Sequence, residues 1–284
     1  MPTAGDWKCV AAGNNRFVAI RTGSNAAASS LDGITWTART MPASREWNSV
    51  VYGGGIFVAV AGNLDSGAIS TDGTTWTSTT LPVFGDSSFS EWVDITYGAN
   101  KFVALSNSGN YVGVGVYNSG TNTISWTPRT MDVIDDSSNR SWQSIAYGNN
   151  RFVAISNTGE VGYSFDTIEW YPATMPSQDG STAHNWKKIR YAQGVFFAVG
   201  DTGERVVEAD DTTGPTTFAA TSFDGVVWTE RELASEESWS AIGFGNPYIA
   251  SSDSTTGKKT PMWIAVSDTS VSYTHLTLPT NREV

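Results

Sequence analysis

The chain is poor in cysteine, in histidine and in positive charge. Its 284 residues include one cysteine and two histidines, and the formal net charge is −11 at pH 7. The single cysteine, Cys9, excludes an internal disulfide framework and a cysteine-based metal cluster. The excess of negative charge argues against nucleic acid or an anionic membrane surface as a partner. No apolar run approaches the length of a transmembrane helix, so we expect no insertion into a membrane.

Familiar catalytic and cofactor motifs are missing as well. The chain has no glycine-rich phosphate loop in the right context and no metal-ligand spacing, so we predict no cofactor and no metal. Two acidic clusters, VIDDSSN (133–139) and VEADDTTG (207–214), lack the regular spacing of a calcium loop. We interpret them as solvated loop charge. Two-carboxylate glycosidase chemistry stays open, because one face of a repeat protein can gather acids from several copies.

What the chain does contain is glycine, tryptophan and an internal repeat. It has 28 glycines and 12 tryptophans, a composition typical of all-β proteins with tight turns. A tryptophan opens each copy, and a short turn and an apolar run such as FVAI follow. The opening tryptophans lie 40–53 residues apart. The six opening segments are WKCVAAG (7–13), WNSVVYG (47–53), WVDITYG (92–98), WQSIAYG (142–148), WKKIRYA (186–192) and WSAIGFG (239–245).

Each copy predicts four β-strands. The opening segment alternates between two faces, as a half-buried strand does. The turns GNNRF and GGGIF place Asn-Asn or Gly-Gly where a hairpin needs positive φ. The FVA run is apolar on both faces, which indicates a strand inside a sheet. We expect the third strand to end at a Ser-x-Asp-Gly turn. The fourth should end at a Met-Pro or Leu-Pro pair (41–42, 81–82 and 175–176), because proline cannot donate to the ladder.

Four strands in every 40–53 residues predict a β-propeller. We expect an all-β fold of four-stranded antiparallel blades, with five complete blades and a truncated sixth, in a single domain over residues 1–270. The repeats start near residues 7, 47, 92, 142, 186 and 239. The parent ring is expected to have six or seven blades.

The Ser-x-Asp-Gly turn ends in tryptophan in most copies. Glycine permits the tight turn, and the Ser and Asp side chains can accept hydrogen bonds from nearby backbone N–H groups. The Trp ring can pack between adjacent blades. The fourth copy, SFDTIEW, lacks the glycine. We assign a structural role to Ser30, Asp32, Gly33, Trp36, Ser70, Asp72, Gly73, Trp76, Ser164, Asp166, Trp170, Ser222, Asp224, Gly225 and Trp228.

These turns resemble the Asp-box, or BNR, repeat of sialidase-like propellers, whose pattern is Ser-x-Asp-x-Gly-x-Thr-Trp. Here the interval from Asp to Trp is one residue shorter. The resemblance spans residues 1–270 as an array, and it implies a fold rather than an activity, because the Asp-box of that family lies away from the active site. A sialidase also needs an arginine in an Arg-Ile-Pro or Arg-Leu-Pro motif. No arginine of this chain is followed by Ile-Pro or Leu-Pro.

The connections between copies vary most in length and content, and we expect binding there, since a rigid scaffold commonly positions binding loops. In propellers these connections share one face with the loops between second and third strands, where the insertion at 203–218 also falls. Exposed aromatic, arginine and amide groups suit contact with carbohydrate or protein. The candidate binding residues are Phe84, Phe89, Arg140, His184 and Asn185.

Three functions are compatible with the sequence. We favour a non-catalytic binding or structural module, because repeats with this turn look similar to those of phage tail and other virion proteins. Such a module would lie on a virion, outside the cell or on a cell surface, and its partners would be a cell-surface glycan, a protein or other virion proteins. The alternatives are a sialidase-like glycoside hydrolase and a bacterial scaffold for protein assembly. Whether the chain is an enzyme stays open.

Both ends of the chain depart from the repeat. The tail VSYTHLTLPTNREV (271–284) resembles the in-frame translation of a transposase sequencing adapter, so we expect native sequence to stop near Thr269. MPTAGDW (1–7) aligns with MPASREW (41–47), which places Met1 where a fourth strand normally ends. We expect either an internal start or a missing upstream strand that would complete the last blade. The N-terminal segment shows no signal-peptide pattern.

Overall fold

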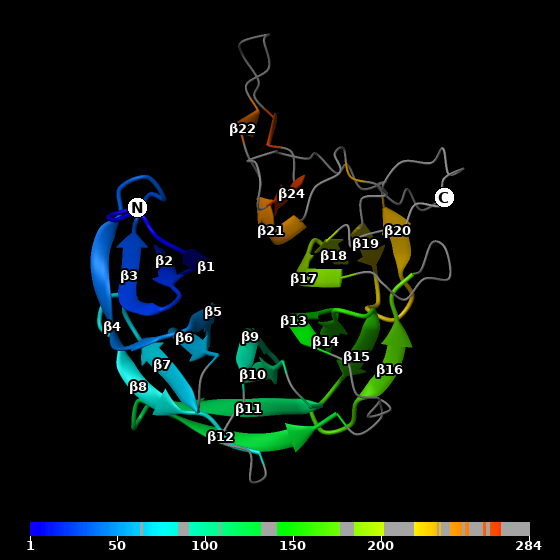
Figure 1. Cartoon of the computed structure of the whole chain (residues 1–284), viewed down its shortest axis with the longest axis horizontal. Coiled ribbons are helices and arrows are strands. Elements are labelled where there is room, and N and C mark those ends of the chain that lie inside the picture. Colours follow the sequence, from blue (N-terminus) through cyan, green and yellow to red (C-terminus); the bar gives the residue numbers. More distant parts are fainter. Residues whose placement is uncertain are drawn as a thin grey trace.

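The computed structural model describes residues 1–62, 65–84, 91–107, 109–131, 141–176, 185–201, 219–231, 233, 239–245, 248–249, 258–259 and 262–267. Every regular element in these residues is a β-strand, and they contain no helix that could cross a membrane. Five four-stranded sheets stand around a central axis, and a two-stranded sheet continues the ring (Figure 1). The predicted all-β propeller, with five complete blades and an incomplete sixth, is confirmed for this part of the chain.

The strands of each blade follow one another from the centre of the ring to its rim. The first two blades contain β1 (Trp7–Gly13), β2 (Arg16–Arg21), β3 (Ser24–Ser30), β4 (Thr37–Arg45), β5 (Trp47–Gly53), β6 (Ile56–Ala61), β7 (Ser66–Ser70) and β8 (Thr77–Thr80). The third and fourth contain β9 (Trp92–Gly98), β10 (Lys101–Ser106), β11 (Tyr111–Asn118), β12 (Thr123–Thr130), β13 (Trp142–Gly148), β14 (Arg151–Ser156), β15 (Glu160–Ser164) and β16 (Tyr171–Thr174). The fifth contains β17 (Asn185–Ala192), β18 (Val195–Asp201), β19 (Ala219–Ser222) and β20 (Thr229–Arg231). The sixth sheet pairs β21 (Trp239–Gly245) with β24 (Met262–Ser267), and β22 (Tyr248–Ile249) pairs separately with β23 (Lys258–Lys259).

The inner hairpins turn where the sequence predicted residue pairs with positive φ. Asn14 and Asn15 have φ angles of 48° and 55°, and Gly54 and Gly55 have φ angles of 55° and 88°. Two consecutive left-handed residues form the two-residue turn whose twist matches an antiparallel hairpin. Each hairpin therefore returns the chain directly into a second strand, and β6 is buried along its whole length, as its apolar sequence predicted.

One strand boundary differs from the prediction. β4 does not end at the pair Met41-Pro42 but continues to Arg45. Its pairing with β3 shifts between Ser24 and Ala26, so Pro42 lies in an unpaired stretch of the outermost strand. A proline is tolerated there because its missing N–H removes no ladder hydrogen bond. β8 and β16 end directly before their Leu-Pro and Met-Pro pairs, as predicted.

The hydrophobic core consists of layers, each shared by two adjacent blades. Between the first and second blades, Val18 and Ile20 of β2 pack with Trp47 and with the closing Trp76. The same arrangement recurs at the next three interfaces, and between the fifth and sixth blades the opening Trp239 packs with Trp263 of β24 in place of a closing Trp. Burial of one Trp ring removes roughly 150–250 Å² from water, which is worth about 4–6 kcal/mol before entropy is counted. The predicted place of the closing Trp, between blades, is confirmed for Trp76, Trp126, Trp170 and Trp228, whereas Trp36 of the first blade belongs to none of these layers.

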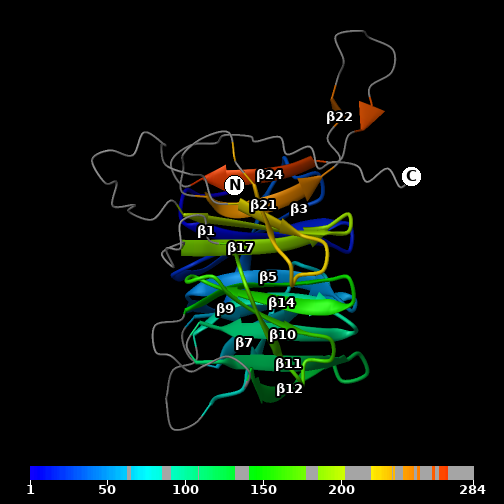
Figure 2. The same cartoon turned by 90° about the vertical axis from the view of Figure 1, so that its right-hand side faces the viewer.

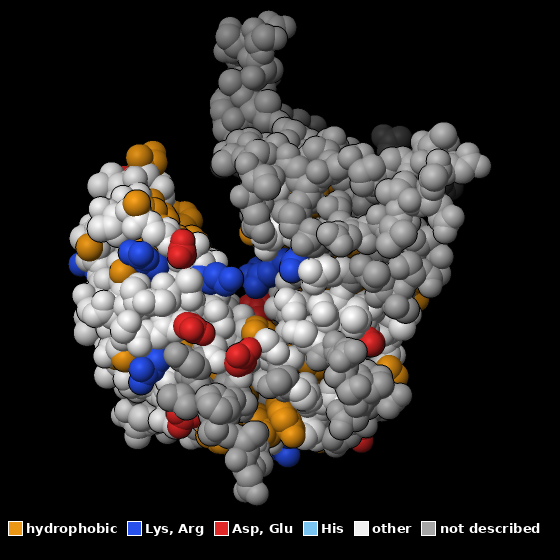
Figure 3. All heavy atoms as spheres, in the orientation of Figure 1, with side chains coloured by type: hydrophobic (Ala, Val, Ile, Leu, Met, Phe, Trp, Pro, Cys, Tyr) orange, Lys and Arg blue, Asp and Glu red, His pale blue; other side chains and the backbone are white. Residues whose placement is uncertain are grey.

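The ring is open between the first and sixth blades. Figure 1 shows β1 and β21 on either side of the opening, and Figure 3 shows a notch that leads to the centre. The face of the first blade at this opening is apolar. Val10 is 51% exposed and Phe17 is 37% exposed, whereas the equivalent Val50 and Phe57 of the second blade are 4% and 0% exposed.

A repeated glycine sets the distance between neighbouring inner strands. A Cβ atom built on Gly53, the last residue of β5, would lie 2.0 Å from Cγ of Tyr97 in the next blade. Glycine alone leaves room for this ring. The opening segments that end in an aromatic residue and a glycine, such as Tyr52-Gly53, therefore place the glycine against the aromatic ring of the next blade. The same contact recurs for Gly13 with Tyr52, Gly98 with Tyr147 and Gly148 with Tyr191.

The Ser-x-Asp-Gly turn is held by its own side chains, as predicted. In the first blade, Ser30 Oγ accepts a hydrogen bond from the Gly33 N–H at 2.8 Å and donates to Asp32 Oδ1 at 2.9 Å. Asp32 Oδ1 also accepts from the N–H groups of Thr35 and Ile34 at 2.7 and 2.8 Å. These backbone donors, with Ser30, favour the charged carboxylate and lower the pKa of Asp32 to about 2. The turns of the second, fourth and fifth blades have equivalent hydrogen bonds.

The same turns connect each blade to its neighbour. Asn14, in the inner hairpin of the first blade, donates to the carbonyl of Thr71 in the turn of the second blade at 3.2 Å. Equivalent bonds join Lys101 Nζ to the Asp166 carbonyl at 2.8 Å and Asn149 to the Phe223 carbonyl at 3.0 Å. The turns therefore lie on the face of the ring that carries the inner hairpins, opposite the connections between blades.

In the fourth blade a threonine stands where the other turns have glycine. Thr167 has a φ angle of 74° and is buried, and its N–H donates to Ser164 Oγ at 2.8 Å. A β-branched residue in this left-handed region is strained by about 1–3 kcal/mol. The hydrogen bonds of the turn and its contact with the third blade hold Thr167 in this conformation.

Replacing Thr167 by Gly should raise the free energy of unfolding by up to about 1 kcal/mol, which is the strain relieved less the greater freedom of glycine in the unfolded chain. The reverse change, Gly225→Thr, should lower it, because a Cβ there would lie 2.5 Å from Val153 Cγ2. Urea denaturation of both variants measures the difference. A Thr167→Gly variant less stable than the parent would show that contacts of the Thr167 side chain outweigh its strain.

Replacing Gly98 by Ala should lower the free energy of unfolding by about 1–3 kcal/mol, because the added methyl group overlaps the Tyr147 ring. Gly243→Ala is the matched control, since no described atom lies within 4 Å of a Cβ atom built on this glycine of β21. Thermal and urea denaturation compare the two variants. Equal stability of both would mean that Tyr147 moves aside without cost.

Candidate binding site in the central channel

The inner strands bring one residue of each repeat to the centre, namely the residue two positions after the opening Trp. In the first five blades these residues, which we call the central ring, are Cys9, Ser49, Asp94, Ser144 and Lys188. Ser49 Oγ donates to Asp94 Oδ1 at 2.6 Å, and Ser144 Oγ donates to Asp94 Oδ2 at 2.6 Å. Cys9 Sγ lies 4.0 Å from Ser49 Oγ. The side chains of the central ring are thus connected from blade to blade.

Asp94 is the centre of this network. It is fully buried, and its Oδ2 lies 3.0 Å from Lys188 Nζ and 3.6 Å from Arg190 Nη1. The Ile145 N–H also donates to Oδ2 at 3.1 Å. Burial by itself would raise the pKa of Asp94, but the charges of Lys188 and Arg190 and the hydroxyl of Ser144 lower it below its ordinary value. Asp94 is therefore a carboxylate paired with two cations rather than an acid ready to transfer a proton.

Lys188 depends on this pairing. Its side chain is 18% exposed. Burial and the neighbouring charge of Arg190 lower the pKa of Lys188, while Asp94 acts in the opposite direction. Removing the carboxylate would leave two cations side by side in the channel.

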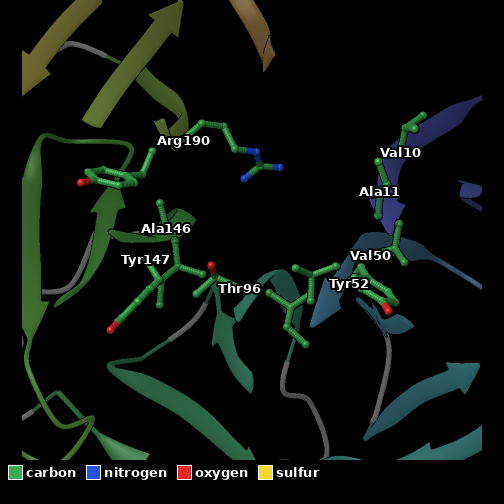
Figure 4. Close-up of a pocket in the computed structure, with 13 residues that line it drawn as sticks. Val10, Ala11, Val50, Tyr52, Thr96, Ala146, Tyr147 and Arg190 are labelled. Atoms are coloured by element: carbon green, nitrogen blue, oxygen red, sulfur yellow. The ribbon is translucent and has the colours of Figure 1, made fainter. Parts of the chain in front are cut away.

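The inner strands enclose a cavity of about 240 Å³ beside the central ring. Its wall comes from β1, β5, β9, β13 and β17, at positions three to five after the opening Trp (Figure 4). The residue at position four is Ala11, Val51, Thr96 or Ala146 in the first four blades and Arg190 in the fifth. Among the described residues that line the cavity, Arg190 is the one with a charge.

Arg190 extends from β17 across the cavity, toward Val10 and Ala11 of the first blade (Figure 4). Its side chain is 33% exposed, and its Nη1 donates to the Ile189 carbonyl at 3.2 Å. The blue side chains at the centre of Figure 3 show positive charge around this opening of the channel. The arrangement can attract an anionic group into the channel.

The described part of the channel offers little for acid–base catalysis. Two-carboxylate glycoside hydrolysis needs a pair of acidic groups roughly 5–10 Å apart. Within the central ring and the described cavity wall, Asp94 is the one carboxylate. In the described residues, moreover, no three His, Cys, Asp or Glu side chains form a group that could hold a metal ion.

The sequence placed Phe84 among exposed binding residues, and this expectation is wrong. Phe84 is 8% exposed, and its ring stacks on Tyr111 with centroids 4.2 Å apart. It belongs to the layer between the second and third blades, where it also approaches Trp92. Because Phe84 comes two residues after Pro82, the sequence suggested a residue of the connection between blades. Its side chain packs instead into the layer between the second and third blades.

The other candidate binding residues are only partly placed. Asn185 is the first residue of β17, opposite Asp201 of β18, and so lies in a strand rather than in the connection before it. Phe89, Arg140 and His184 lie outside the described residues, as do the two acidic clusters. Their predicted role in binding stays a prediction.

The residues that build the channel were not singled out from the sequence. Asp94, Lys188 and Arg190 lay in opening segments that were interpreted as ordinary strands. A signal was present nevertheless. When the copies are aligned on the opening Trp, the second position after it is Cys, Ser, Asp, Ser, Lys and Ala, polar in most copies.

No protein-family model matches the chain, and no curated protein matches it by sequence. Solved structures do share its fold. Virginiamycin B lyase from Staphylococcus aureus, solved as a catalytically inactive variant with quinupristin, is 14% identical, with a TM-score of 0.66 over 93% of this chain and 79% of that one. YCF48 from Cyanidioschyzon merolae is 14% identical, with a TM-score of 0.54 over 89% of this chain and 80% of that one. YCF48 has also been solved bound to D1 peptide. At such low identity the likeness shows the fold alone, which is that of a β-propeller.

Replacing Asp94 by Asn should lower the free energy of unfolding by about 3–5 kcal/mol, because Lys188 would remain without its buried partner. Adding Lys188→Met to Asp94→Asn should restore part of this loss, so the two changes should not be additive. Urea denaturation of the two single variants and the double variant measures the coupling. Additive losses would mean that Lys188 is solvated independently of Asp94.

Proposed function

We propose that the chain is a non-catalytic binding propeller that takes up a ligand in its central channel. The cavity beside the central ring supports this most directly. It presents one partly exposed cation, Arg190, while the neighbouring carboxylate, Asp94, is buried and paired with two cations. Such a site can hold an anionic group, but its described residues offer no free acid or base for chemistry.

The setting that we propose is a phage tail, another part of a virion or a bacterial cell surface, where the propeller would contact a host-surface glycan or protein. Support comes from the array of turns, whose Ser30, Asp32 and Gly33 are hydrogen-bonded as a structural Asp-box turn requires. YCF48 bound to D1 peptide adds that a propeller of similar shape can bind a polypeptide. The connections between blades would supply further contacts on the opposite face from these turns.

A sialidase-like hydrolase is the competing proposal, and virginiamycin B lyase illustrates that a propeller of similar shape can be an enzyme. The chain lacks the Arg-Ile-Pro or Arg-Leu-Pro motif expected of a sialidase. The pairing of Asp94 with Lys188 and Arg190 also disfavours an acid–base role for the channel carboxylate. A scaffold for protein assembly would use the same fold without the cavity.

The full chain should bind components of a broad glycan array or of bacterial cell envelopes, and it should not release methylumbelliferone from 4-methylumbelliferyl N-acetylneuraminic acid. Binding is measured by fluorescence of the labelled chain, and turnover by fluorescence of the released product over a day. Turnover above the buffer rate, abolished by Asp94→Asn in a folded variant, would replace the binding proposal with a hydrolase. Absence of both binding and turnover would favour the scaffold.

A further inference from the structure

We propose that the opening of the ring is a self-association surface, on which the free face of the first blade binds the free face of the sixth blade of a second copy. The contact repeats, between two copies, the interface that joins neighbouring blades within the chain. Such association is independent of the proposed function, because it does not depend on which ligand the channel binds.

Each interface inside the chain joins two unlike faces. One blade supplies the third and fifth residues of its second strand, such as Val18 and Ile20, which form what we call the following face. The next blade supplies its opening Trp, the residue three positions after it and the second residue of its second strand, as Trp47, Val50 and Phe57 do. We call this side the Trp face. The two faces meet in the same way at each later interface, with a Trp in place of the Phe in the sixth blade.

The Trp face of the first blade has no neighbouring blade among the described residues, and its interface positions are exposed. Trp7 is half-buried, whereas the opening Trp of each of the other five blades is fully buried. Val10 is 51% exposed and Phe17 is 37% exposed, whereas their equivalents in the other blades are at most 9% and 1% exposed. Side chains that the repeat buries elsewhere thus lie open to solvent here. The equivalents of Val10 are Val50, Ile95, Ile145, Ile189 and Ile242, and those of Phe17 are Phe57, Phe102, Phe152, Phe196 and Trp263.

The sixth blade presents the complementary face. Trp263 and Ala265 of β24 pack against the fifth blade. Because successive strand residues point to opposite sides, Ile264 and Val266 point toward the opening. Both are half-buried, whereas the equivalent residues of the other five blades are fully buried. The opening is therefore bounded by the two unlike halves of one interface. The buried equivalents are Val18, Ile20, Val58, Val60, Val103, Leu105, Val153, Ile155, Phe197 and Val199.

The two free faces of one copy do not cover each other. β1 and β21 stand on either side of the opening, and the exposure of Val10 and Phe17 shows that no layer forms across it (Figure 1). Closing the opening would change the angle at the interior interfaces, where glycines of the inner strands already contact the tyrosine of the next blade. A second copy can cover a free face without any change in these angles. Since the two faces are unlike, the contact is head-to-tail rather than symmetric.

The charge of the chain sets the conditions for this contact. Two copies of net charge −11 repel each other, while burial of the apolar faces favours their association. Arg21 stands in the free Trp face where the second blade has Ala61, and its positive charge offsets only part of the repulsion. Salt screens the repulsion between copies, so association should strengthen as the salt concentration rises.

The first test is analytical ultracentrifugation of the full chain. The weight-average mass should rise above that of one chain as the protein concentration increases from about 1 to about 100 μM. The rise should be steeper in about 0.5 M than in about 0.05 M sodium chloride. A mass that stays at that of one chain under all these conditions would overturn the proposal.

Two single variants then locate the contact. Val10→Lys places a charge in the Trp face and Ile264→Lys places one in the following face, so each should weaken association about tenfold or more. Val116→Lys is the matched control and should associate as the parent does. Val116 is also 51% exposed, but it lies on β11 of the third blade, which has a neighbour on each side. Melting temperatures confirm that the variants are folded. Equal weakening by Val116→Lys, or undiminished association of Val10→Lys, would place the contact elsewhere and contradict the proposal.

Mixing the variants tests the head-to-tail arrangement. The Val10→Lys copy keeps an intact sixth blade, and the Ile264→Lys copy keeps an intact first blade. An equimolar mixture should therefore recover association and stop at one copy of each. A contact between two like faces would not be restored by mixing, and that result would refute the head-to-tail contact. A parent that stays a single copy and loses as much stability with Val10→Lys as with Val50→Lys would show instead that the ring closes within one copy.

Discussion

The structure depends on contact between neighbouring blades. Among the residues that the structure describes, no blade encloses a core of its own, because each hydrophobic layer combines second-strand residues of one blade with the opening Trp of the next and, in the first four layers, with its closing Trp. At the centre, a glycine of one inner strand lies under the tyrosine of the neighbouring blade. A second contact is the hydrogen bond from an inner hairpin to the Ser-x-Asp-Gly turn, or its equivalent, in the next blade. Each blade thus corresponds to one sequence repeat, whereas the stability of the fold depends on the interfaces between blades.

Features that recur in most copies could be predicted from the sequence, because a repeated fold has to repeat the residues that make it. The hairpin turns, the second strands and the Ser-x-Asp-Gly turns all fall in this group. Single departures could not be predicted in the same way. Pro42 looked like the end of a strand, but on the outermost strand a bulge accommodates it. Phe84 looked exposed because burial between blades depends on the path of a unique segment, which no periodicity describes.

The candidate site was missed for a related reason. Asp94 lies 85 residues after Cys9, and Lys188 and Arg190 lie 94 and 96 residues after Asp94, yet the ring brings all of them to one axis. A pattern read along the chain shows them among other polar residues, such as Thr96 and Lys187, in alternating strands. Aligning the copies on the opening Trp would have placed Asp94 and Lys188 at one position and Arg190 two positions later, but the pairing of an acid from the third blade with cations from the fifth follows from ring geometry alone.

The position of these residues determines the charge of the channel. Side chains two positions after the opening Trp meet their counterparts from several blades at the axis, while residues three and five positions after it pack in the layers between blades. A change at an axial position alters the charge of the channel, and at Asp94 it is also expected to lower the free energy of unfolding. At Thr167, where the other turns have glycine, a departure from the repeat at an interface position strains the backbone. The chemistry of the channel is thus set at the axis, where Asp94 pairs with Lys188 and Arg190.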